Sequence, residues 1–441
     1  MRREGFMGGV HADDCKELTA DRPIRAMDPP EQVTIPLSQH IGTPCAPLVK
    51  KDDRVLVGQI IGDAEDRLTA PVHSSVSGTV LGVTTIEAPG GRKVQAVSIA
   101  NDGMYELAPG LEVDHDPLEL EPAELIRRIR DAGIVGMGGA AFPTHFKLDV
   151  PPDKQVDTLV VNGVECEPYL TADHRLMLES GEAIKQGILV AMRALGVRRA
   201  LVGVEENKPD AIASLGDLLA DADGIEVVPL KVKYPQGAEK QLIKAILDRE
   251  VPPGRLPMDV GVVVINIGTA AAIADALYRG MPLIQRVVTV TGPIVREPAN
   301  ILARIGTPVS HLVESCGGLT EDLGKFIVGG PMMGVAHHTL DTPVTKGMSG
   351  VLLFSRSQAK LLEPTVCIRC GKCIQVCPMG LIAGGFAEMV ETGRYEEAEQ
   401  NHIFDCIECG CCAYICPASR RIVQSIRQGK NEIMRRRSQS A

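Results

Sequence analysis

The sequence predicts a multidomain α/β and β protein that ends in a small, cysteine-rich helical domain. With 441 residues, the chain is too long for a single hydrophobic core. Short apolar strands alternate with helical segments between residues 121 and 284, a pattern typical of a parallel sheet covered by helices. Nine of the 13 cysteines lie between Cys367 and Cys416. We therefore divide the chain into four domains, 1–120, 121–284, 285–353 and 354–441.

Composition and charge exclude several classes of protein. Hydrophobic residues make up 44% of the chain and charged residues 23%, the balance of an ordinary globular protein. A formal net charge of −10 would repel a phosphate backbone, so nucleic acid is not an expected partner. The start of the chain lacks the apolar core of a secretory signal, and the longest apolar stretch, 261–277, is interrupted by Asn266 and Asp275. We expect no transmembrane helix, a cytoplasmic location and, because disulfides are rare there, metal or redox chemistry at the cysteines.

Residues 1–120 are expected to form a small β domain. Pro, Gly and short Val, Ile and Thr runs dominate this region, for example at 54–61 and 76–83. The segment APVHSSVSGTV at 70–80 resembles half of the barrel-sandwich fold of biotinyl and lipoyl domains. It lacks the lysine that carries the cofactor in those domains, so we interpret it as scaffold.

Residues 121–284 are expected to form a Rossmann-like α/β domain. Apolar runs predict strands at 158–162, 200–204, 225–230 and 262–266. Helical spacing predicts helices at 122–132, 174–195, 209–220 and 238–248. The β-rich stretch 285–353 is expected to be a small module for packing or docking. We interpret the basic tail 427–441 as a solvated, frayed end, with contact to acidic headgroups or an acidic partner as the alternative.

Two four-cysteine runs in the last domain carry the strongest chemical signal. Each has the spacing C-x-x-C-x-x-C-x-x-x-C-P of bacterial ferredoxins, in which the fourth cysteine ligates the other cluster. One [4Fe-4S] cluster is therefore assigned to Cys367, Cys370, Cys373 and Cys416 and the second to Cys406, Cys409, Cys412 and Cys377, with Cys411 left over. A zinc site is the alternative, but it gives no role to the third and fourth cysteines of each run or to the following proline. Helical periodicity at 381–401 predicts a helical ferredoxin module.

A glycine-rich loop at 136–147 is a candidate cofactor loop. It carries Gly136, Gly138 and Gly139, where a flat ring or a phosphate can approach the backbone without a Cβ in the way. The loop does not have the G-x-G-x-x-G spacing of dinucleotide-binding turns. A tight structural turn explains the glycines equally well.

An acidic loop follows the strand predicted at 158–162. Asn162, Glu165 and Glu167 suit hydrogen bonding to a polar cofactor, because ligands bind at the ends of strands in open α/β sheets. The alternative is that the two carboxylates cap the next helix.

Both loops resemble the FMN and NADH loops of the flavin-binding subunit of respiratory complex I, and more closely the C subunit of the Rnf-type ion-translocating electron-transport complex. The opening FMGGVH at 6–11, the run IPLSQHIG at 35–42 and the two ferredoxin motifs also match that C subunit. The resemblance covers nearly the whole chain. It implies that 285–353 is a β-grasp (soluble ligand-binding) domain.

The resemblance also implies roles for individual residues. Gly136, Gly138 and Gly139 would face FMN and NADH, and Lys147 would lie near phosphate. The catalytic carboxylates that orient the nicotinamide would be Glu165 and Glu167. The other cofactor-binding residues would be Asn162, Tyr234, Gly237, Glu239, Asn266 and Thr269, with a core role as the alternative for Tyr234. Two residues depart from the pattern: Ala141 stands where the family usually has a glycine, and Ala238 stands where complex I has an acid. The second departure makes it less certain that the nicotinamide contacts of complex I apply to this chain.

The implied function is electron transport. NADH delivers two electrons at once as hydride, an iron–sulfur cluster takes one, and a flavin divides the pair. We expect a peripheral subunit on the cytoplasmic side of the membrane, which exchanges electrons between NADH and membrane-bound redox subunits of an ion-translocating ferredoxin:NAD oxidoreductase through FMN and two [4Fe-4S] clusters. The alternatives are a flavin and iron–sulfur cobalamin reductase, in whose family the ferredoxin motifs precede a later β-grasp region, and a cluster-only electron carrier.

Overall fold

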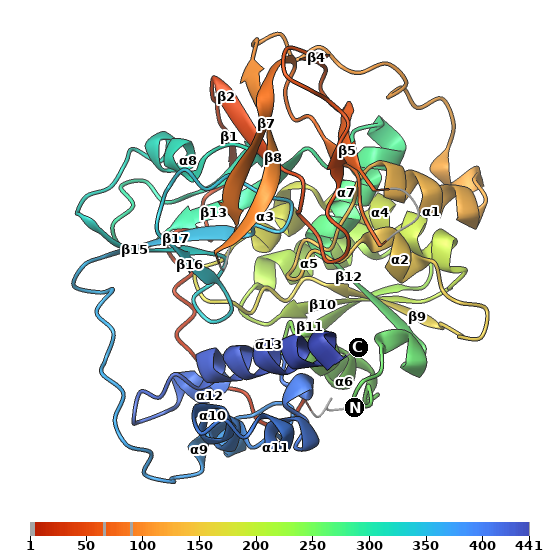
Figure 1. Ribbon diagram of the computed structural model, residues 1–441. Coiled ribbons are helices and arrows are strands. Elements are labelled where there is room, and N and C mark those ends of the chain that lie inside the picture. Colours follow the sequence, from red (N-terminus) through yellow and green to blue (C-terminus); the bar gives the residue numbers. More distant parts are fainter. Residues whose placement is uncertain (1–4, 65–67, 89–90, 441) are drawn as a thin grey trace.

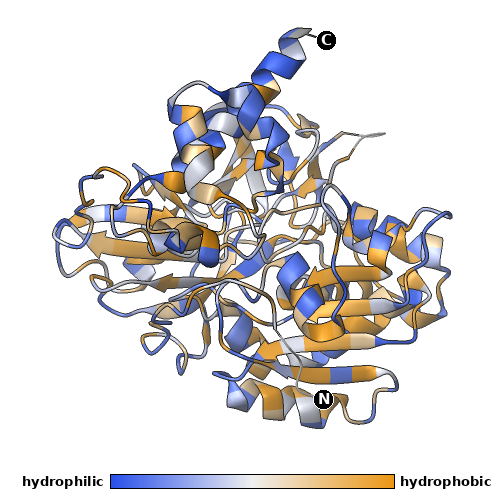
Figure 2. Cartoon of the chain, turned by 90° about the horizontal axis from the view of Figure 1, so that it is seen from below, coloured by the Kyte–Doolittle hydropathy of each residue, from blue (hydrophilic) through white to orange (hydrophobic). Residues whose placement is uncertain are grey.

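The computed structural model describes residues 5–64, 68–88 and 91–440; residues 1–4 and 441, the ends of the first and fourth predicted domains, lie outside this description. Figure 1 shows β-rich parts above and to the left, an α/β layer in the centre and a helical C-terminal module below. Hydrophobic residues are concentrated in the strands and on the inner sides of helices (Figure 2).

The N-terminal region forms two small antiparallel sheets. The larger has the order β2-β8-β7-β4, and the smaller has the order β3-β5-β6. Their strands are β2 (Gln32–Pro36), β3 (Ala46–Pro47), β4 (Arg54–Val55), β5 (Ile60–Asp63), β6 (Val72–His73), β7 (Gly78–Ala88) and β8 (Arg92–Asn101). The run predicted at 54–61 is divided between β4 and β5, because the chain turns between them at Gly58, whose φ is +81°.

A six-stranded mixed sheet has the order β1-β14-β13-β17-β15-β16, and all its strands except β1 follow the α/β domain in sequence. Its strands are β1 (Ile24–Ala26), β13 (Gln285–Thr291), β14 (Ala299–Arg304), β15 (Leu323–Val328), β16 (Val335–His337) and β17 (Gly350–Ser355), with helix α8 (Val309–Ser315) beside them. Strand β1 comes from the N-terminal region and pairs in parallel with β14. The two β regions also share one hydrophobic core, in which Val33 and Ile35 lie with Ile301 and Val309.

The α/β domain contains a four-stranded, fully parallel sheet of order β11-β10-β9-β12. Its strands are β9 (Thr158–Asn162), β10 (Ala200–Glu205), β11 (Ile225–Leu230) and β12 (Val262–Asn266). Its helices are η1 (Pro117–Glu119), α1 (Pro122–Asp131), α2 (Thr144–Leu148), α3 (Ala172–Glu179), α4 (Gly181–Leu195), α5 (Pro209–Leu219), α6 (Glu239–Leu247), η2 (Pro257–Val260) and α7 (Ile267–Arg279). Helices α4, α5 and α7 cover one face of the sheet and α6 the other. The helix predicted at 174–195 is two helices separated at Ser180.

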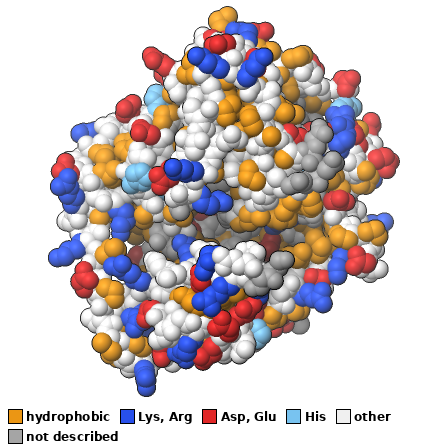
Figure 3. Space-filling view, in the orientation of Figure 1, with side chains coloured by type: hydrophobic (Ala, Val, Ile, Leu, Met, Phe, Trp, Pro, Cys, Tyr) orange, Lys and Arg blue, Asp and Glu red, His pale blue; other side chains and the backbone are white. Residues whose placement is uncertain are grey.

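The C-terminal module is helical, as its periodicity predicts. It consists of α9 (Lys372–Gln375), α10 (Ala383–Glu391), α11 (Tyr395–Gln400), η3 (Ile403–Asp405), α12 (Cys411–Tyr414) and α13 (Ile422–Ser440). The expectation of a frayed tail is wrong. Helix α13 buries Ile426 and Ile433 against α10, and Arg436 and Arg437 form ion pairs with glutamates of α11. Acidic and basic side chains are accordingly mixed on the exposed surface of this module (Figure 3).

Candidate functional site

The candidate cofactor site lies where the parallel strands β9 and β12 end, at Asn162 and Asn266. Asn266 Oδ1 accepts a hydrogen bond from Gly268 N (2.8 Å) and so caps α7. Its Nδ2 donates to Asp173 Oδ2 (2.6 Å). Asn162 Nδ2 donates to the carbonyl of Gly237 (2.8 Å), which ties the acidic loop to the segment that precedes α6. Three separate segments, 162–173, the one containing Gly237, and 266–268, therefore meet at one edge of the sheet.

The glycine loop packs directly on this edge. Met137 N donates to Thr269 Oγ1 (3.0 Å), so Thr269 holds the loop against the start of α7. A Cβ added to Gly138 would lie 2.8 Å from Asn266 Nδ2, whereas one added to Gly139 would meet no atom within 4 Å. Gly138 is thus required for close packing, whereas Gly139 is exposed and leaves open space beside the backbone. A flat ring can approach such a backbone without meeting a Cβ.

Lys147 and Glu239 form an ion pair beside the site. Lys147 Nζ, on α2, donates to Glu239 Oε1 (2.6 Å) and to the carbonyl of Val264 (3.0 Å). Glu239 is the first residue of α6. Two of the three ammonium hydrogens are engaged in these bonds, which leaves one donor for a phosphate.

The two predicted catalytic carboxylates face different neighbours. Glu165 accepts from Asp173 N (2.7 Å) and His174 N (3.1 Å) at the start of α3, the capping role that was the alternative for it. Glu167 instead accepts from Met332 N (3.0 Å) and Met333 N (2.8 Å), in the loop between β15 and β16. Burial raises the pKa of Glu167 above its usual value. Both carboxylates are therefore held in fixed orientations by backbone donors.

Two buried lysines shape the acidic loop from beneath. Lys16 Nζ donates to the carbonyls of Glu165 (3.0 Å), Glu167 (3.0 Å) and Leu170. Lys208 Nζ donates to the carbonyl of Val164 (2.8 Å). Because buried ammonium groups need several oxygen partners, these lysines fix the backbone path of the loop.

Asp173 is a site residue that the sequence analysis missed. Its carboxyl accepts from Asn266 Nδ2, and burial together with the neighbouring Glu165 charge raises its pKa to about 7. Its position in the first turn of α3 gives a sequence signal only for helix capping. Gln236 was also missed; its buried Nε2 has no hydrogen-bond partner among the described residues.

Tyr234 differs from the other predicted cofactor-binding residues. Its ring is buried, and its hydroxyl donates to the carbonyl of Cys409 (2.7 Å) in the C-terminal module. Gly237, three residues later, donates its N–H to Cys166 Sγ (3.3 Å) in the acidic loop. The segment that begins at Tyr234 therefore joins the α/β site to the cysteine module.

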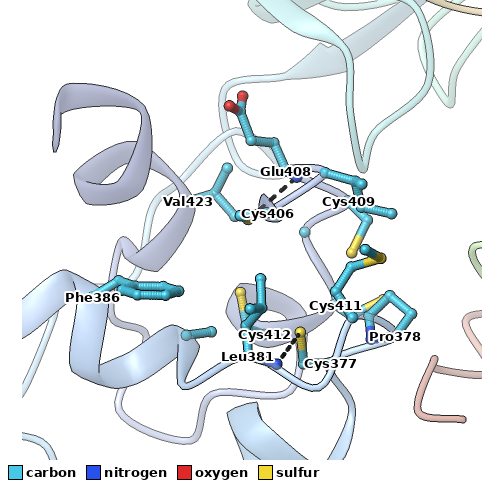
Figure 4. Close-up of a pocket in the computed structure, with 14 residues that line it drawn as sticks. Cys377, Pro378, Leu381, Phe386, Cys406, Glu408, Cys409, Cys411, Cys412 and Val423 are labelled. Carbon is cyan, nitrogen blue, oxygen red and sulfur yellow. Dashed lines mark hydrogen bonds between the residues drawn. The ribbon is translucent and has the colours of Figure 1, made fainter. Parts of the chain in front are cut away.

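One cavity in that module is lined by thiols from both cysteine runs. Figure 4 shows Cys377 from the first run together with Cys406, Cys409 and Cys412 from the second. Leu381 N donates to Cys377 Sγ (3.3 Å) and Glu408 N donates to Cys406 Sγ (3.4 Å). Thiolates that bind a metal cluster commonly accept such hydrogen bonds from backbone N–H groups. Among the described residues, no three potential ligands converge as the ligands of a single metal ion do. The donor set and the shared cavity fit a [4Fe-4S] cluster.

The remaining four motif cysteines lie on the outer side of the module. Cys367 and Cys370 are exposed, and Cys373 and Cys416 are partly buried. Thr365 N donates to the carbonyl of Ala418 (2.9 Å), which brings the beginning of the first run beside the end of the second. The leftover Cys411 is fully buried, with its Sγ 3.9 Å from the carbonyl of Tyr234.

Comparison with protein families divides the chain in the expected order. Residues 4–104 match the RnfC barrel sandwich hybrid domain, 129–275 the Nuo51 FMN-binding domain, 287–336 the SLBB domain and 359–417 a 4Fe-4S dicluster domain. These matches confirm the expectation of FMN and of two [4Fe-4S] clusters. Among the described residues, none of the helices has the length and apolar character needed to cross a membrane.

A solved structure resembles the chain in fold. The NAD+-reducing [NiFe]-hydrogenase in the H2-reduced state aligns with a TM-score of 0.51 at 19% identity, covering 71% of this chain and 63% of that chain.

Full-length relatives are more informative than this fold similarity. The C subunit of the Na+-translocating ferredoxin:NAD+ oxidoreductase complex of Acetobacterium woodii is 48% identical over 433 residues, covering 98% of each chain. The C subunit of the proton-translocating complex of Clostridium ljungdahlii is 48% identical, covering 97% of this chain and 94% of its own. The C subunit of the ion-translocating oxidoreductase complex of Rhodobacter capsulatus is 43% identical, covering 98% and 83%. The chain belongs to the family of C subunits of ion-translocating ferredoxin:NAD+ oxidoreductase complexes.

Proposed function

We propose that this protein is a peripheral subunit on the cytoplasmic side of the membrane, where it exchanges electrons between NADH and membrane-bound redox subunits of such a complex. The observation that carries the proposal is the hydrogen bond from Tyr234 to Cys409, because it joins the cofactor edge of the α/β sheet to the cavity lined by five cysteines, four of which are the proposed ligands. When bound, FMN accepts a hydride from NADH and passes its two electrons singly to one-electron clusters. A proton is released as the flavin is reoxidised.

The residues at the sheet edge bind and orient the cofactors. The parallel strand order supports a Rossmann-like arrangement, in which ligands lie at the carboxyl ends of the strands. Gly136, Gly138 and Gly139 admit the flat ring, and Lys147 uses its remaining N–H to bind phosphate. The other contacts come from Asn162, Gly237, Glu239, Asn266 and Thr269.

Glu165 and Glu167 are proposed to orient the nicotinamide. Each carboxylate accepts two backbone N–H groups and keeps lone pairs for further donors, since an ionised carboxylate offers about four acceptor sites. The backbone donors remove rotational freedom before the substrate arrives, so orientation costs less when NADH binds. Tyr234 is proposed to support the flavin site by packing. Its side chain is buried, and its hydroxyl already donates a hydrogen bond to the carbonyl of Cys409.

The two ligand sets are proposed to follow the crossed ferredoxin pattern. Cys406, Cys409, Cys412 and Cys377 would hold the cluster next to Tyr234. Cys367, Cys370, Cys373 and Cys416 would hold the outer cluster, whose exposed ligands suit exchange with a partner subunit.

Anaerobic reduction by NADH tests the function. Full-length protein reconstituted with FMN, iron and sulfide should show loss of flavin absorbance on addition of NADH, followed by the electron paramagnetic resonance signals of reduced clusters. A Cys409→Ser variant should retain the flavin step while losing one cluster. Clusters that form normally in a protein without NADH-dependent flavin reduction would refute the proposal in favour of a cluster-only carrier. Reduction of cob(III)alamin or cob(II)alamin at rates that exceed those of other one-electron acceptors would favour the cobalamin reductase.

A further inference from the structure

The segment formed by residues 6–10, which we call the strap, runs between the α/β domain and the cysteine module. In Figure 1 the N-terminal trace descends from the β region to the C-terminal helices. The strap is anchored at both ends by buried side chains, since Phe6 and Val10 are 7% and 5% exposed. None of the cofactor or cluster assignments uses this segment.

On one side the strap is bonded to the α/β domain. Val10 and Tyr234 form an antiparallel bridge, in which Val10 N donates to the Tyr234 carbonyl (2.8 Å) and Tyr234 N to the Val10 carbonyl (2.9 Å). Lys233 Nζ donates to the carbonyl of Phe6 (2.8 Å) and lies 4.5 Å from the centroid of its ring. The strap therefore grips the segment that also carries the bond to Cys409.

On the other side the strap touches the loop that carries a proposed cluster ligand. Gly9 N donates to the carbonyl of Val376 (2.8 Å). A Cβ added to Gly8 would lie 2.7 Å from the carbonyl oxygen of Cys377, and Gly8 has a φ of +70°. Only glycine satisfies both the backbone conformation and the approach to Cys377.

The bonds of the strap surround a small apolar core. Val10, Tyr234, Cys409 and Cys411 are buried together, with Met332 packed against them. The core thus contains groups from the strap, the flavin-side segment, the loop bonded by Glu167 and the second cysteine run. Displacement of the strap would therefore change the separation between the second cysteine run and the flavin-side segment that begins at Tyr234.

We propose that residues 6–10 are a positioning element, which sets the separation between the flavin site and the cluster held by Cys377, Cys406, Cys409 and Cys412. The inference rests on the proposed function. The step that it would control is the transfer of single electrons from the reduced flavin to the oxidised cluster, in which the two electrons of one hydride leave one at a time and its single proton is released over the two transfers. Hydride transfer from NADH to FMN does not pass through the strap.

Two substitutions perturb the strap from different sides. Gly8→Ala introduces a methyl group against the Cys377 carbonyl. Lys233→Met keeps the aliphatic stem but removes the bond to Phe6, without altering a residue at positive φ or a cluster ligand. Gly103→Ala is the matched control, because Gly103 also has a φ of +70° but an added Cβ meets no atom within 4 Å. Any effect of backbone strain alone appears in this control.

Rapid mixing of the reconstituted full-length proteins with NADH separates the two steps. Flavin reduction should match wild type in all three variants. Cluster reduction should be slower by roughly 10- to 100-fold in Gly8→Ala and by a smaller factor in Lys233→Met, since small displacements of reacting groups have effects of this size. A redox titration followed by electron paramagnetic resonance should show a shifted midpoint potential for one of the two clusters in Gly8→Ala, with iron content unchanged.

The outcomes distinguish this inference from the proposed function. Wild-type rates and potentials in both Gly8→Ala and Lys233→Met would overturn the strap while flavin reduction by NADH continues to support the function. If Gly8→Ala does not fold, wild-type cluster reduction in Lys233→Met alone overturns the inference. Equal slowing in Gly103→Ala would also overturn it, because strain rather than position would then explain the effect. Absence of flavin reduction in wild type would instead refute the proposed function.

Discussion

Gly138 and Gly139 form a matched pair of positions in the candidate flavin loop. A Cβ at Gly138 would lie 2.8 Å from Asn266 Nδ2 and 3.0 Å from its Cγ, whereas a Cβ at Gly139 would meet nothing within 4 Å. Neither glycine is among the residues with positive φ. Alanine therefore adds a steric contact at one position and fills open space at the other.

The cost at Gly138 depends on how far Asn266 can move. Asn266 is held on both sides, by its cap on Gly268 N and by its bond to Asp173. Overpacking costs roughly 1–3 kcal/mol, and loss of a helix cap costs about 1 kcal/mol. We expect Gly138→Ala to lower the free energy of unfolding of the FMN-free protein by roughly 2–3 kcal/mol, because the side chain either stays compressed or gives up its cap.

Gly139→Ala separates packing from cofactor binding. With no contact to disturb, the free energy of unfolding should stay within about 0.5 kcal/mol of wild type. FMN affinity should nevertheless fall about tenfold, equivalent to ~1.4 kcal/mol, because the methyl group occupies the space proposed for the flat ring. Urea unfolding without FMN measures the first quantity, and quenching of FMN fluorescence during titration measures the second.

Each variant has an outcome that refutes its part of the reasoning. Wild-type stability of Gly138→Ala would refute the close packing against Asn266. Wild-type FMN affinity of Gly139→Ala would refute the placement of the ring beside that glycine. Equal loss of stability in both variants would mean that backbone freedom, and not contact, accounts for the glycines.

Three further predictions concern the clusters, the buried acid and the tyrosine. Cys377→Ser should remove the signal of one cluster and Cys416→Ser that of the other, each with the loss of about four irons; loss of the same cluster in both variants would exclude the crossed ligand sets. Because the pKa of Asp173 is raised to about 7, the folded protein binds a proton between about pH 4 and 7 that the unfolded chain lacks, so stability falls as pH rises through this window. Asp173→Asn should therefore gain stability relative to wild type between pH 5 and 8 in denaturant titrations, and a constant difference would contradict this pKa. Tyr234→Phe should slow cluster reduction more than flavin reduction in rapid mixing, since it removes the hydrogen bond to Cys409; an unchanged rate of cluster reduction would show that this bond is irrelevant to transfer.

Local patterns predicted the α/β domain closely. Strands β9, β11 and β12 have the predicted bounds, because apolar runs bounded by polar residues report strand formation directly. The apolar spacing over 174–195 predicted one continuous helix, but the structure has two helices there. The break at Ser180 separates α3, which supports the cofactor edge, from α4, which packs on α7.

Contacts between distant segments were not predictable in the same way. The strand Ile24–Ala26 is too short to signal a sheet, and its partner Ala299–Arg304 lies in another predicted domain. The tail appeared solvated because Arg435, Arg436 and Arg437 dominate its composition, but the glutamates of α11 that pair with Arg436 and Arg437 lie more than thirty residues away. Long-range ion pairs and sheet edges leave no periodic signal in a single sequence.

The acidic loop contacts the surroundings of both proposed redox sites. Its backbone is fixed from below by Lys16 and Lys208, which hold four of its carbonyls. One of its carboxylates, that of Glu165, binds the start of α3 at the cofactor edge, while Glu167 binds the β15–β16 loop, where Met332 packs beside Cys409. Because the same segment contacts both surroundings, we expect it to contribute, together with residues 6–10, to the separation between the proposed flavin site and the proposed cluster. We therefore expect the two buried lysines to support both proposed sites by fixing this backbone, without contacting a cofactor.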